Sequence, residues 1–315
     1  MRWLEGCLTG LAGQVYKDYK IIVVDDASTD GSKEFILKYY PQIVVLSNQE
    51  QRGFAATVNK GIRSATTEYI VLLNTDTIPS PGWLQSLINE ADKSPLTVGS
   101  FASKMLQMEK TELIDDAGDL LMSDGCAIKR GHGRPASEFD KKCEVFSACA
   151  GAALYRYEFL KKTGGFDEAF ESYLEDVDIG LRGHLLGYSC LFVPSAKVLH
   201  YGHGSGIPTG RYVQLVTKNR LMLILKNFPI HILIRNFFTI LRGLGCHFVA
   251  CRKPAASIHG YLSFIALIPH VLKERKFLQA RRVINDYTIL NLFTSHKIPG
   301  DEQEGKGRSD EDSLY

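Results

Sequence analysis

Short apolar runs alternate with segments of helical spacing along much of the chain. Residues 21–24, 43–46 and 69–73 lack polar alternation, which is typical of strands covered on both faces of a parallel sheet. Residues 2–13 have apolar positions at the spacing of an amphipathic helix that packs on a sheet. We therefore predict an α/β fold, in which a mostly parallel sheet lies between helices.

The pattern changes beyond residue 211 to longer apolar stretches. Lys226, Arg235 and Arg242 interrupt these stretches, so none is a continuous run of the roughly 20 apolar residues that span a bilayer. Helices that lie in a membrane interface fit this pattern, with packing on the main domain as the alternative. We predict an α/β domain over residues 1–210 and a helical, membrane-interfacial appendage over residues 211–299. A disordered tail follows over residues 300–315, which have little to bury.

Composition narrows the class of protein. With 45% hydrophobic and 23% charged residues, the 315-residue chain can bury a substantial core. Its 37 basic and 35 acidic residues leave a net charge of +2, which argues against a nucleic-acid partner. The 7 cysteines form no CxxC pair, and the first residues lack a signal peptide. We expect a cytoplasmic protein that is peripheral on the inner face of the membrane.

Acidic residues follow the predicted strands or begin a helix. Asp25 and Asp26 follow the first apolar run, Asp76 follows the run at 69–73, and Glu175 and Asp176 open a helix that ends near residue 187. In open α/β sheets, ligands bind beyond the carboxyl ends of the strands. Each acid taken alone is more often a turn former or a partner of the helix dipole. Together they predict a site at one edge of the sheet.

Carboxylates at these positions favour a divalent metal. A dinucleotide-binding protein would carry G-x-G-x-x-G after its first strand, and this chain carries acids there instead. Carboxylates accept a nucleotide diphosphate through Mg²⁺ or Mn²⁺, so we predict such a metal at Asp76, with His200 completing the coordination. Asp176 is the candidate proton acceptor. Asp178 and Arg182 have the spacing of an ion pair, so Asp178 is expected to be structural.

Several motifs together carry a resemblance over about residues 2–226. They are Ile22-Val-Val-Asp-Asp-Ala-Ser-Thr-Asp-Gly31, Arg52-Gly-Phe-Ala, Asn59-Lys-Gly61, Leu73-Asn-Thr-Asp-Thr77, Gly165-Phe-Asp-Glu, Glu175-Asp-Val-Asp178 and His200-Tyr-Gly-His203. The chain resembles glycosyltransferase family 2, whose nucleotide-diphospho-sugar transferase fold is called GT-A. Asn74 stands where the D-x-D metal motif has its first acid, as in the rhamnosyltransferase-like branch.

The resemblance implies an activity and roles for single residues. It implies inverting transfer of a sugar from a nucleotide-diphosphate sugar to an acceptor hydroxyl, on a glycan or a lipid-linked acceptor, in polysaccharide or glycolipid synthesis. The nucleotide-binding residues would be Asp25, Asp26, Arg52 and Asn74, the metal ligands Asp76 and His200, and the catalytic residues Asp176 and Glu175. The alternatives are a non-catalytic sugar-binding or scaffold relative and a nucleotidyltransferase.

The sequence departs from the family at its start. Family members begin with a strand in the middle of the sheet, and this sequence begins on the helix that follows it. We therefore expect that residues 21–24 and 69–73 cannot both be paired on both sides. Each buried amide left unpaired would cost about 1–3 kcal/mol. We expect the 315-residue chain to be part of a longer functional protein, and to fold poorly or bind nucleotide weakly by itself.

Overall fold

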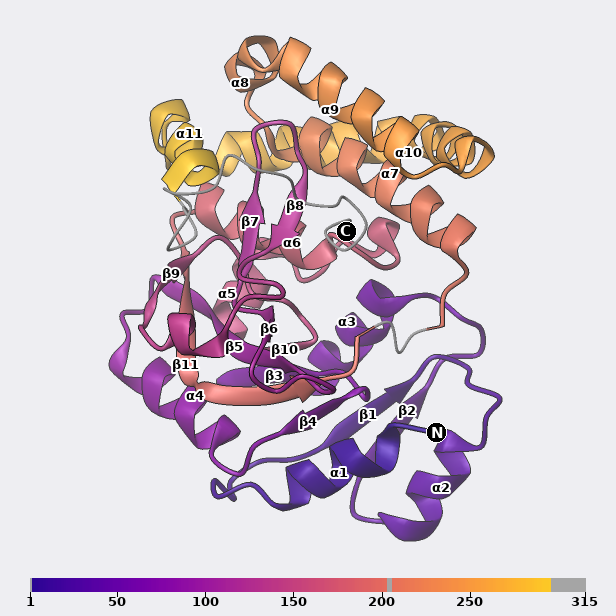
Figure 1. Cartoon of the computed structure of the whole chain (residues 1–315), viewed down its shortest axis with the longest axis vertical. Coiled ribbons are helices and arrows are strands. Elements are labelled where there is room, and N and C mark those ends of the chain that lie inside the picture. Colours follow the sequence, from indigo (N-terminus) through magenta and orange to yellow (C-terminus); the bar gives the residue numbers. More distant parts are fainter. Residues whose placement is uncertain (1, 203–205, 296–315) are drawn as a thin grey trace.

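The computed structural model describes residues 2–202 and 206–295. Figure 1 shows strands at the centre, helices α7–α11 layered at one end, and α1, α2, β1 and β2 at the other. The predicted α/β class is confirmed, as are helices at the C-terminal end. The strands are β1 (Ile22–Asp25), β2 (Val44–Ser47), β3 (Tyr69–Leu73), β4 (Thr77–Pro79), β5 (Val98–Gln107), β6 (Ile114–Asp116), β7 (Asp119–Leu121), β8 (Ala127–Lys129), β9 (Cys143–Val145), β10 (Ala152–Arg156) and β11 (Ser189–His200).

The helices lie between and after these strands. They are α1 (Leu4–Ala12), α2 (Ser32–Tyr39), α3 (Phe54–Ser64), α4 (Trp83–Lys93), α5 (Tyr157–Thr163), α6 (Glu175–Leu185), α7 (Thr209–Asn227), α8 (Ile230–Arg235), α9 (Phe237–Ala250), α10 (Pro254–Arg281) and α11 (Asp286–Ser295), with two short 3₁₀ helices, η1 (Ala136–Phe139) and η2 (Glu168–Phe170). The predicted tail at 300–315, residues 296–299 and His203 lie outside the described residues.

The main sheet has the strand order β3-β10-β5-β11-β4, with β6 beside β5 and β9 beside β11. Strands β5 and β11 run parallel, whereas β10 is antiparallel to both β3 and β5. Strand β10 is buried along its whole length, but β3 is mostly half-buried, with only Ile70 buried. The expectation that residues 69–73 are covered on both faces is therefore wrong, because β3 lies at the end of the main path of this sheet.

Strands β1 and β2 form a separate two-stranded parallel sheet, in which Ile22 is opposite Val44. Strand β1 pairs only with β2, and β3 pairs only with β10, among the strands that the structure describes. Each is therefore paired along one side, as the sequence argument expects. Helix α1 covers the small sheet through Leu4 and Leu8, which share a core cluster with Ile36.

A narrow hairpin joins the middle of the molecule to the C-terminal helices. In β7 and β8, Asp119 is opposite Lys129 and Leu121 is opposite Ala127. Figure 1 shows the tip of this hairpin close to α7 and α9. The hairpin thus connects an acidic region at its base with the helical layer at its tip.

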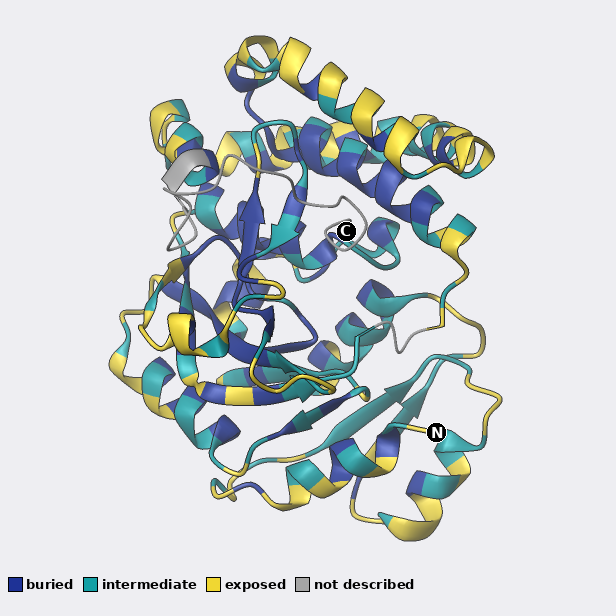
Figure 2. Cartoon of the chain, viewed as in Figure 1, coloured by how far each residue is buried: buried dark blue, intermediate teal, exposed yellow. Residues whose placement is uncertain are grey.

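The C-terminal helices share a core with α6. One hydrophobic cluster contains Leu174 and Val177 together with Met222, Leu223 and Val271. Figure 2 shows α7 buried along most of its length beneath the outer helices. The predicted boundary at 210/211 falls within α7, and the hydrophobic core continues across it. The division of the chain into domains stays a prediction.

The outer helices expose a broad apolar surface. Phe238 is 82% exposed and Val249 is 74% exposed, both on α9. Figure 2 shows exposed residues along the outer sides of α8, α9 and α10. Helix α10 is the one helix of the described chain that is long and apolar enough to cross a membrane, although the sequence suggested that none is. This is weak evidence for a span, because Gly260 of α10 also packs closely on Thr217 of α7.

Candidate functional site

Helix α6 begins abruptly after a turn of unusual backbone conformation. Tyr173 (φ 71°) and Leu174 (φ 64°) lie in the left-handed region, which side chains other than glycine rarely adopt. The Asn219 Nδ2 atom of α7 lies 2.9, 2.8 and 2.7 Å from the carbonyl oxygens of Phe170, Ser172 and Tyr173. Helix α7 therefore holds the turn that positions the first residues of α6.

The candidate base Asp176 lies in the first turn of α6. The amide of Ala150 donates to its Oδ2 at 3.2 Å, and the amide of Val177 donates to its Oδ1 at 2.8 Å. Burial raises the pKa of Asp176 above its ordinary value, and these amide hydrogen bonds offset part of that rise. A fixed carboxylate with a raised pKa is suited to accept a proton near neutral pH.

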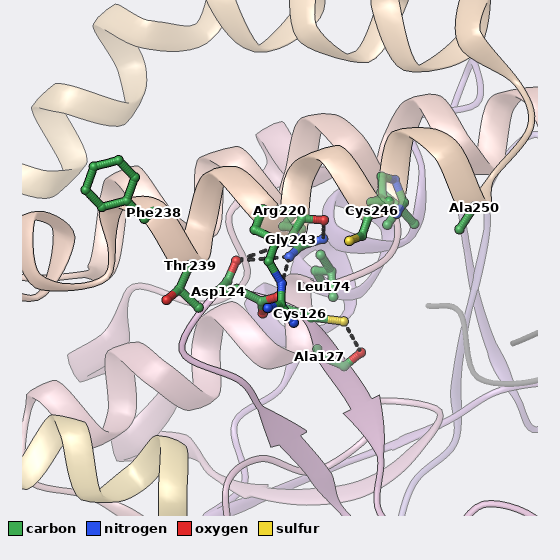
Figure 3. A pocket seen from close by; sticks show the side chains of 14 residues that line it. Asp124, Cys126, Ala127, Leu174, Arg220, Phe238, Thr239, Gly243, Cys246 and Ala250 are labelled. Carbon is green, nitrogen blue, oxygen red and sulfur yellow. Dashed lines mark hydrogen bonds and ion pairs between the residues drawn. The ribbon is translucent and has the colours of Figure 1, made fainter. Parts of the chain in front are cut away.

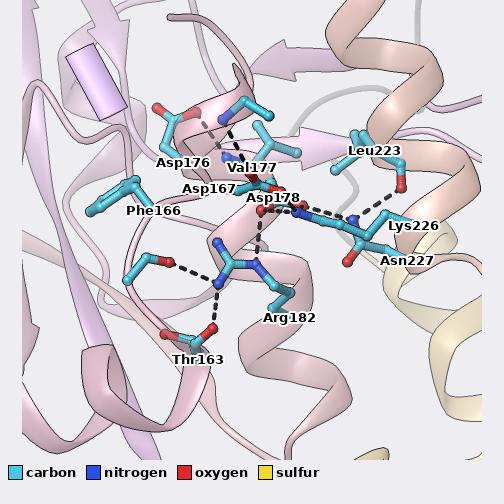
Figure 4. A network of polar contacts seen from close by, with 12 residues as sticks. Thr163, Phe166, Asp167, Asp176, Val177, Asp178, Arg182, Leu223, Lys226 and Asn227 are labelled. Atoms are coloured by element: carbon cyan, nitrogen blue, oxygen red, sulfur yellow. Dashed lines mark hydrogen bonds and ion pairs between the residues drawn. The ribbon is translucent and has the colours of Figure 1, made fainter. Parts of the chain in front are cut away.

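The two acids beside Asp176 differ from it in their surroundings. Asp178 is completely buried, 2.8 Å from both Arg182 Nε and Lys226 Nζ, as Figure 4 shows. The predicted ion pair between Asp178 and Arg182 is confirmed, and Asp178 joins α6 to α7. Glu175 is also buried, and its Oε2 has no hydrogen-bond partner in the part of the chain that the structure describes. Burial, and then the charge of Asp176, raise the pKa of Glu175 well above its ordinary value.

The structure brings together the two predicted metal ligands. Strand β4 pairs with β11 so that Thr77 is opposite His200, which places His200 beside the turn that carries Asp76. His200 Nε2 lies 3.5 Å from Asp76 Oδ2, and Nδ1 lies 2.7 Å from Asp115 Oδ2. Burial lowers the pKa of His200, but the two carboxylates outweigh it and raise the pKa to about 9.

Asp115 and its neighbours are the residues that sequence reasoning missed. Lys129 Nζ lies 3.2 Å from Asp115 Oδ2, and Asp116 and Asp119 are buried close by. Burial raises the pKa of Asp116 to about 6, and the charge of Asp176 acts in the same direction. The available signal was the run Ile114-Asp-Asp-Ala-Gly-Asp119, in which acids interrupt a segment predicted only as a strand or hairpin.

The predicted nucleotide-binding acids lie at the end of β1. Asp25 Oδ1 accepts a hydrogen bond from the amide of Ser28 at 3.2 Å. Asp26 accepts hydrogen bonds from Asn48 Nδ2 at 2.7 Å and from the amide of Gly53 at 2.9 Å. Burial raises the pKa of Asp26, but these hydrogen bonds outweigh it, so the pKa is lowered. Asp26 therefore fixes the turn at the start of α3.

The other two predicted nucleotide-binding residues also have protein contacts. Arg52 Nη2 forms an ion pair with Glu168 at 3.1 Å, and its side chain is half exposed. Asn74 follows β3, and its backbone N–H donates a hydrogen bond to the carbonyl oxygen of Gly151 at 2.8 Å. A Cβ atom at Gly151 would lie 3.2 Å from Asn74 Nδ2. The small residues around Gly151 thus allow close packing against Asn74.

The side chains near Asp76 can be compared with the ligands that Mg²⁺ or Mn²⁺ requires. Among residues 2–202 and 206–295, no group of three or more histidine, cysteine or acidic side chains is arranged to hold a metal ion. Sites for nucleotide-bound Mg²⁺ commonly use one or two carboxylates, with substrate phosphates supplying further oxygens. Asp76 and His200 fit this requirement as a pair, provided that His200 loses its proton.

The chain is similar in sequence to known proteins. The sequence model described as "Glycosyl transferase family 2" matches residues 2–164. An N-acetylglucosaminyl-diphospho-decaprenol L-rhamnosyltransferase of Mycobacterium tuberculosis is 24% identical over 227 residues, which cover 64% of this chain and 73% of the relative. The O-antigen biosynthesis protein RfbC of Myxococcus xanthus is 25% identical over 208 residues, or 62% of this chain and 16% of that protein.

Solved structures share the fold at low sequence identity. GalNAc-T7 with UDP, GalNAc and Mn²⁺ has a TM-score of 0.61 at 15% identity and covers 86% of this chain and 54% of its own. S. aureus TarS with UDP-GlcNAc has a TM-score of 0.55 at 17% identity and covers 93% of this chain and 87% of its own. The protein is thus a glycosyltransferase with the GT-A fold. The chain belongs to glycosyl transferase family 2.

Proposed function

We propose that the protein transfers a sugar from a nucleotide-diphosphate donor to an acceptor hydroxyl with inversion at the anomeric carbon. One observation carries this proposal: a series of charged contacts runs from the predicted metal ligand Asp76 as far as Lys129. Asp76 is next to His200, His200 to Asp115, and Asp115 to Lys129. The charge of Lys129 in turn acts on Asp176. A donor held near Asp76 would therefore lie close to the candidate base.

In the proposed reaction, Asp176 removes the proton from the acceptor hydroxyl as its oxygen attacks the anomeric carbon. The bond between that carbon and the diphosphate breaks, and no covalent enzyme intermediate is required. The amides of Ala150 and Val177 fix the carboxylate of Asp176 throughout. A divalent metal held by Asp76 and His200, Mg²⁺ or Mn²⁺, would neutralise the departing diphosphate.

The acceptor is proposed to be a glycan or a lipid-linked sugar, in polysaccharide or glycolipid synthesis. A relative whose name specifies a diphospho-decaprenol acceptor supports this class. The exposed apolar residues of α8, α9 and α10 support peripheral binding to a membrane, which we propose to be on its cytoplasmic face. Exchanging Phe238 and Val249 for aspartate should abolish flotation with liposomes without unfolding the protein, because both side chains are exposed.

The reaction is tested with a panel of nucleotide sugars, with and without Mn²⁺, scored for free nucleoside diphosphate. We expect Mn²⁺-dependent release with at least one donor, and loss of this release in Asp176→Asn. Binding of a donor without release, in the presence of glycan and lipid-linked acceptors, would favour the non-catalytic alternative. Release of inorganic pyrophosphate in place of nucleoside diphosphate would favour a nucleotidyltransferase.

A further inference from the structure

A cavity of about 740 Å³ lies between the tip of the β7–β8 hairpin and helices α7 and α9, as Figure 3 shows. Its volume is in the range of about 300–1,000 Å³ that is typical of small-molecule sites. Leu174, Val216 and Phe238 supply apolar side chains, and Arg220, Arg242 and His247 supply the nitrogen-bearing ones. The cavity is therefore largely apolar, with two arginines and the acid Asp124 on its wall.

The two arginines of this cavity differ in their partners. Arg220 is buried and forms an ion pair with Asp124 Oδ2 at 3.0 Å, so its charge is balanced within the protein. Arg242 is exposed, and it has no hydrogen bond or ion pair with any residue between 2–202 or 206–295. Burial lowers the pKa of His247 to about 4, so His247 is neutral. The net charge that the cavity offers to a ligand is therefore the positive charge of Arg242.

The cavity adjoins the candidate active site at two points. Leu174 lines the cavity and directly precedes Glu175 and Asp176. Ala127 lines it as well and is two positions before Lys129 on β8, a distance of roughly 7 Å along a strand. A ligand in the cavity can therefore extend toward Asp176.

The cavity also adjoins the exposed apolar surface. Phe238 and Ala250 mark its two ends along α9, and Phe238 belongs to the exposed side of the outer helices. A long hydrocarbon chain would not fit within this volume, but it could leave the cavity beside Phe238. The site thus suits an amphiphile with an anionic head, a sugar on one side of that head and an apolar chain on the other.

We propose that this cavity receives the phosphate-bearing end of a polyisoprenoid-linked acceptor, with Arg242 contacting the phosphate. This inference rests on the proposed function, because it identifies the acceptor of that same site. The phosphate lies at Arg242, the first isoprene units lie against Phe238, and the acceptor sugar points past Leu174 toward Asp176. Positive charge on an apolar wall matches this ligand and does not match a neutral glycan.

Cys246 provides a test that does not depend on enzymatic activity. It is an exposed free cysteine that lines the cavity, so a bound ligand should slow its alkylation. Alkylation by N-ethylmaleimide is followed by peptide mass spectrometry, with farnesyl diphosphate as the probe and Cys143 as the internal reference. We expect farnesyl diphosphate to protect Cys246, and farnesol and inorganic pyrophosphate to protect it far less.

A matched pair of variants tests the role of the cation. Arg242→Glu should raise the concentration of farnesyl diphosphate needed for half-protection about threefold to tenfold, the size expected for one exposed charge contact. Arg235→Glu is the control, because Arg235 is an exposed cation of the same helical layer that does not line the cavity. Circular dichroism checks that both variants are folded.

The outcomes separate this inference from the proposed function. Lack of protection in the wild-type protein, or equal effects of the two variants, would overturn the inference even if the donor assay shows turnover. Equal protection by phosphatidylglycerol vesicles without any prenyl phosphate would assign the surface to bilayer lipid and overturn it too. Protection without turnover of any donor would remove the acceptor role and count against the proposed function itself.

Discussion

His200 Nδ1 at the end of β11 lies 2.7 Å from Asp115 Oδ2 in β6, a residue 85 positions earlier in the chain. This contact turns the other ring nitrogen toward Asp76. Asp115 therefore positions the histidine that the sequence predicts as a metal ligand, because a carboxylate bonded to one ring nitrogen commonly orients a ligating histidine.

The contact predicts a specific pH dependence of stability in metal-free protein. The pKa of His200 is raised from 6.5 to about 9 in the folded state, so its stabilising contribution is full below pH 6.5 and is lost as the pH rises through about 9. This contribution is roughly 3 kcal/mol. Urea unfolding between pH 6 and 10 measures it, and Asp115→Asn should flatten the profile and lower the pKa of His200 observed by NMR.

The control for that experiment is Asp140→Asn. Asp140 is exposed and forms an ion pair with Lys104, away from His200. An unchanged profile in Asp115→Asn, or the same flattening in Asp140→Asn, would contradict the role given to Asp115.

Asp176→Asn should abolish transfer and leave nucleotide binding and folding intact. The change removes the proton acceptor but keeps the shape of the side chain, so kcat should fall about 10²- to 10⁴-fold. Glu175→Gln is the comparison, because burial raises the pKa of Glu175 and so favours the neutral carboxyl group that glutamine resembles. Steady-state kinetics distinguishes the two acids. Near-normal turnover in Asp176→Asn, together with loss of turnover in Glu175→Gln, would make Glu175 the proton acceptor.

Asp178→Asn should act on stability. Lys226 and Arg182 would remain buried with their shared carboxylate gone, which costs about 3–5 kcal/mol of the free energy of unfolding. Glu158→Gln removes an exposed ion pair with Lys161 and should leave the free energy of unfolding almost unchanged. Equal midpoints of the two variants in urea would show that the buried network contributes little.

Asp76→Ala should remove Mn²⁺-dependent binding of nucleoside diphosphate measured by isothermal titration calorimetry. Asp76 is the only carboxylate of the predicted metal pair, so its loss leaves His200 alone. Glu109→Ala removes an exposed acid just beyond β5 and should leave binding unchanged. Turnover that resists EDTA would contradict the metal requirement.

Two helical glycines should respond in opposite ways to alanine. A Cβ atom at Gly180 of α6 would lie 2.4 Å from Ser147 Cβ, so Gly180→Ala should destabilise the protein by about 1–3 kcal/mol. Gly245 of α9 has open space at the same position, so Gly245→Ala should stabilise it by up to about 1 kcal/mol. Thermal unfolding compares the stabilities of the two variants. A Gly180→Ala variant that is more stable than the wild type would show that α6 can move away from Ser147.

The sequence was most informative where a residue's role depends on its place at the end of a strand or helix. Asp76, His200 and Asp176 could be predicted this way, and the structure places Asp76 and His200 side by side. The ion pair between Asp178 and Arg182 could be predicted because its spacing is set by one helix.

The features of the fold and the site that could not be predicted depend on pairing between segments that are distant in the sequence. Nothing in the sequence near Asp115 shows that β6 pairs with the same end of β5 that pairs with the end of β11, so the contact of Asp115 with His200 could not be predicted. The burial of β3 was overestimated because an apolar run does not reveal how many neighbours a strand has. Lys129 was overlooked because its partner lies 14 positions away across the hairpin.

The turn before α6 limits how the protein can be shortened. Tyr173 and Leu174 hold a backbone conformation that is unfavourable by itself, and Asn219 of α7 contacts the carbonyls that fix it. A version of the protein ended at the last strand would keep every predicted site residue in its sequence. It would lose the side chain that holds Asp176 in place, so engineering a minimal enzyme has to retain α7.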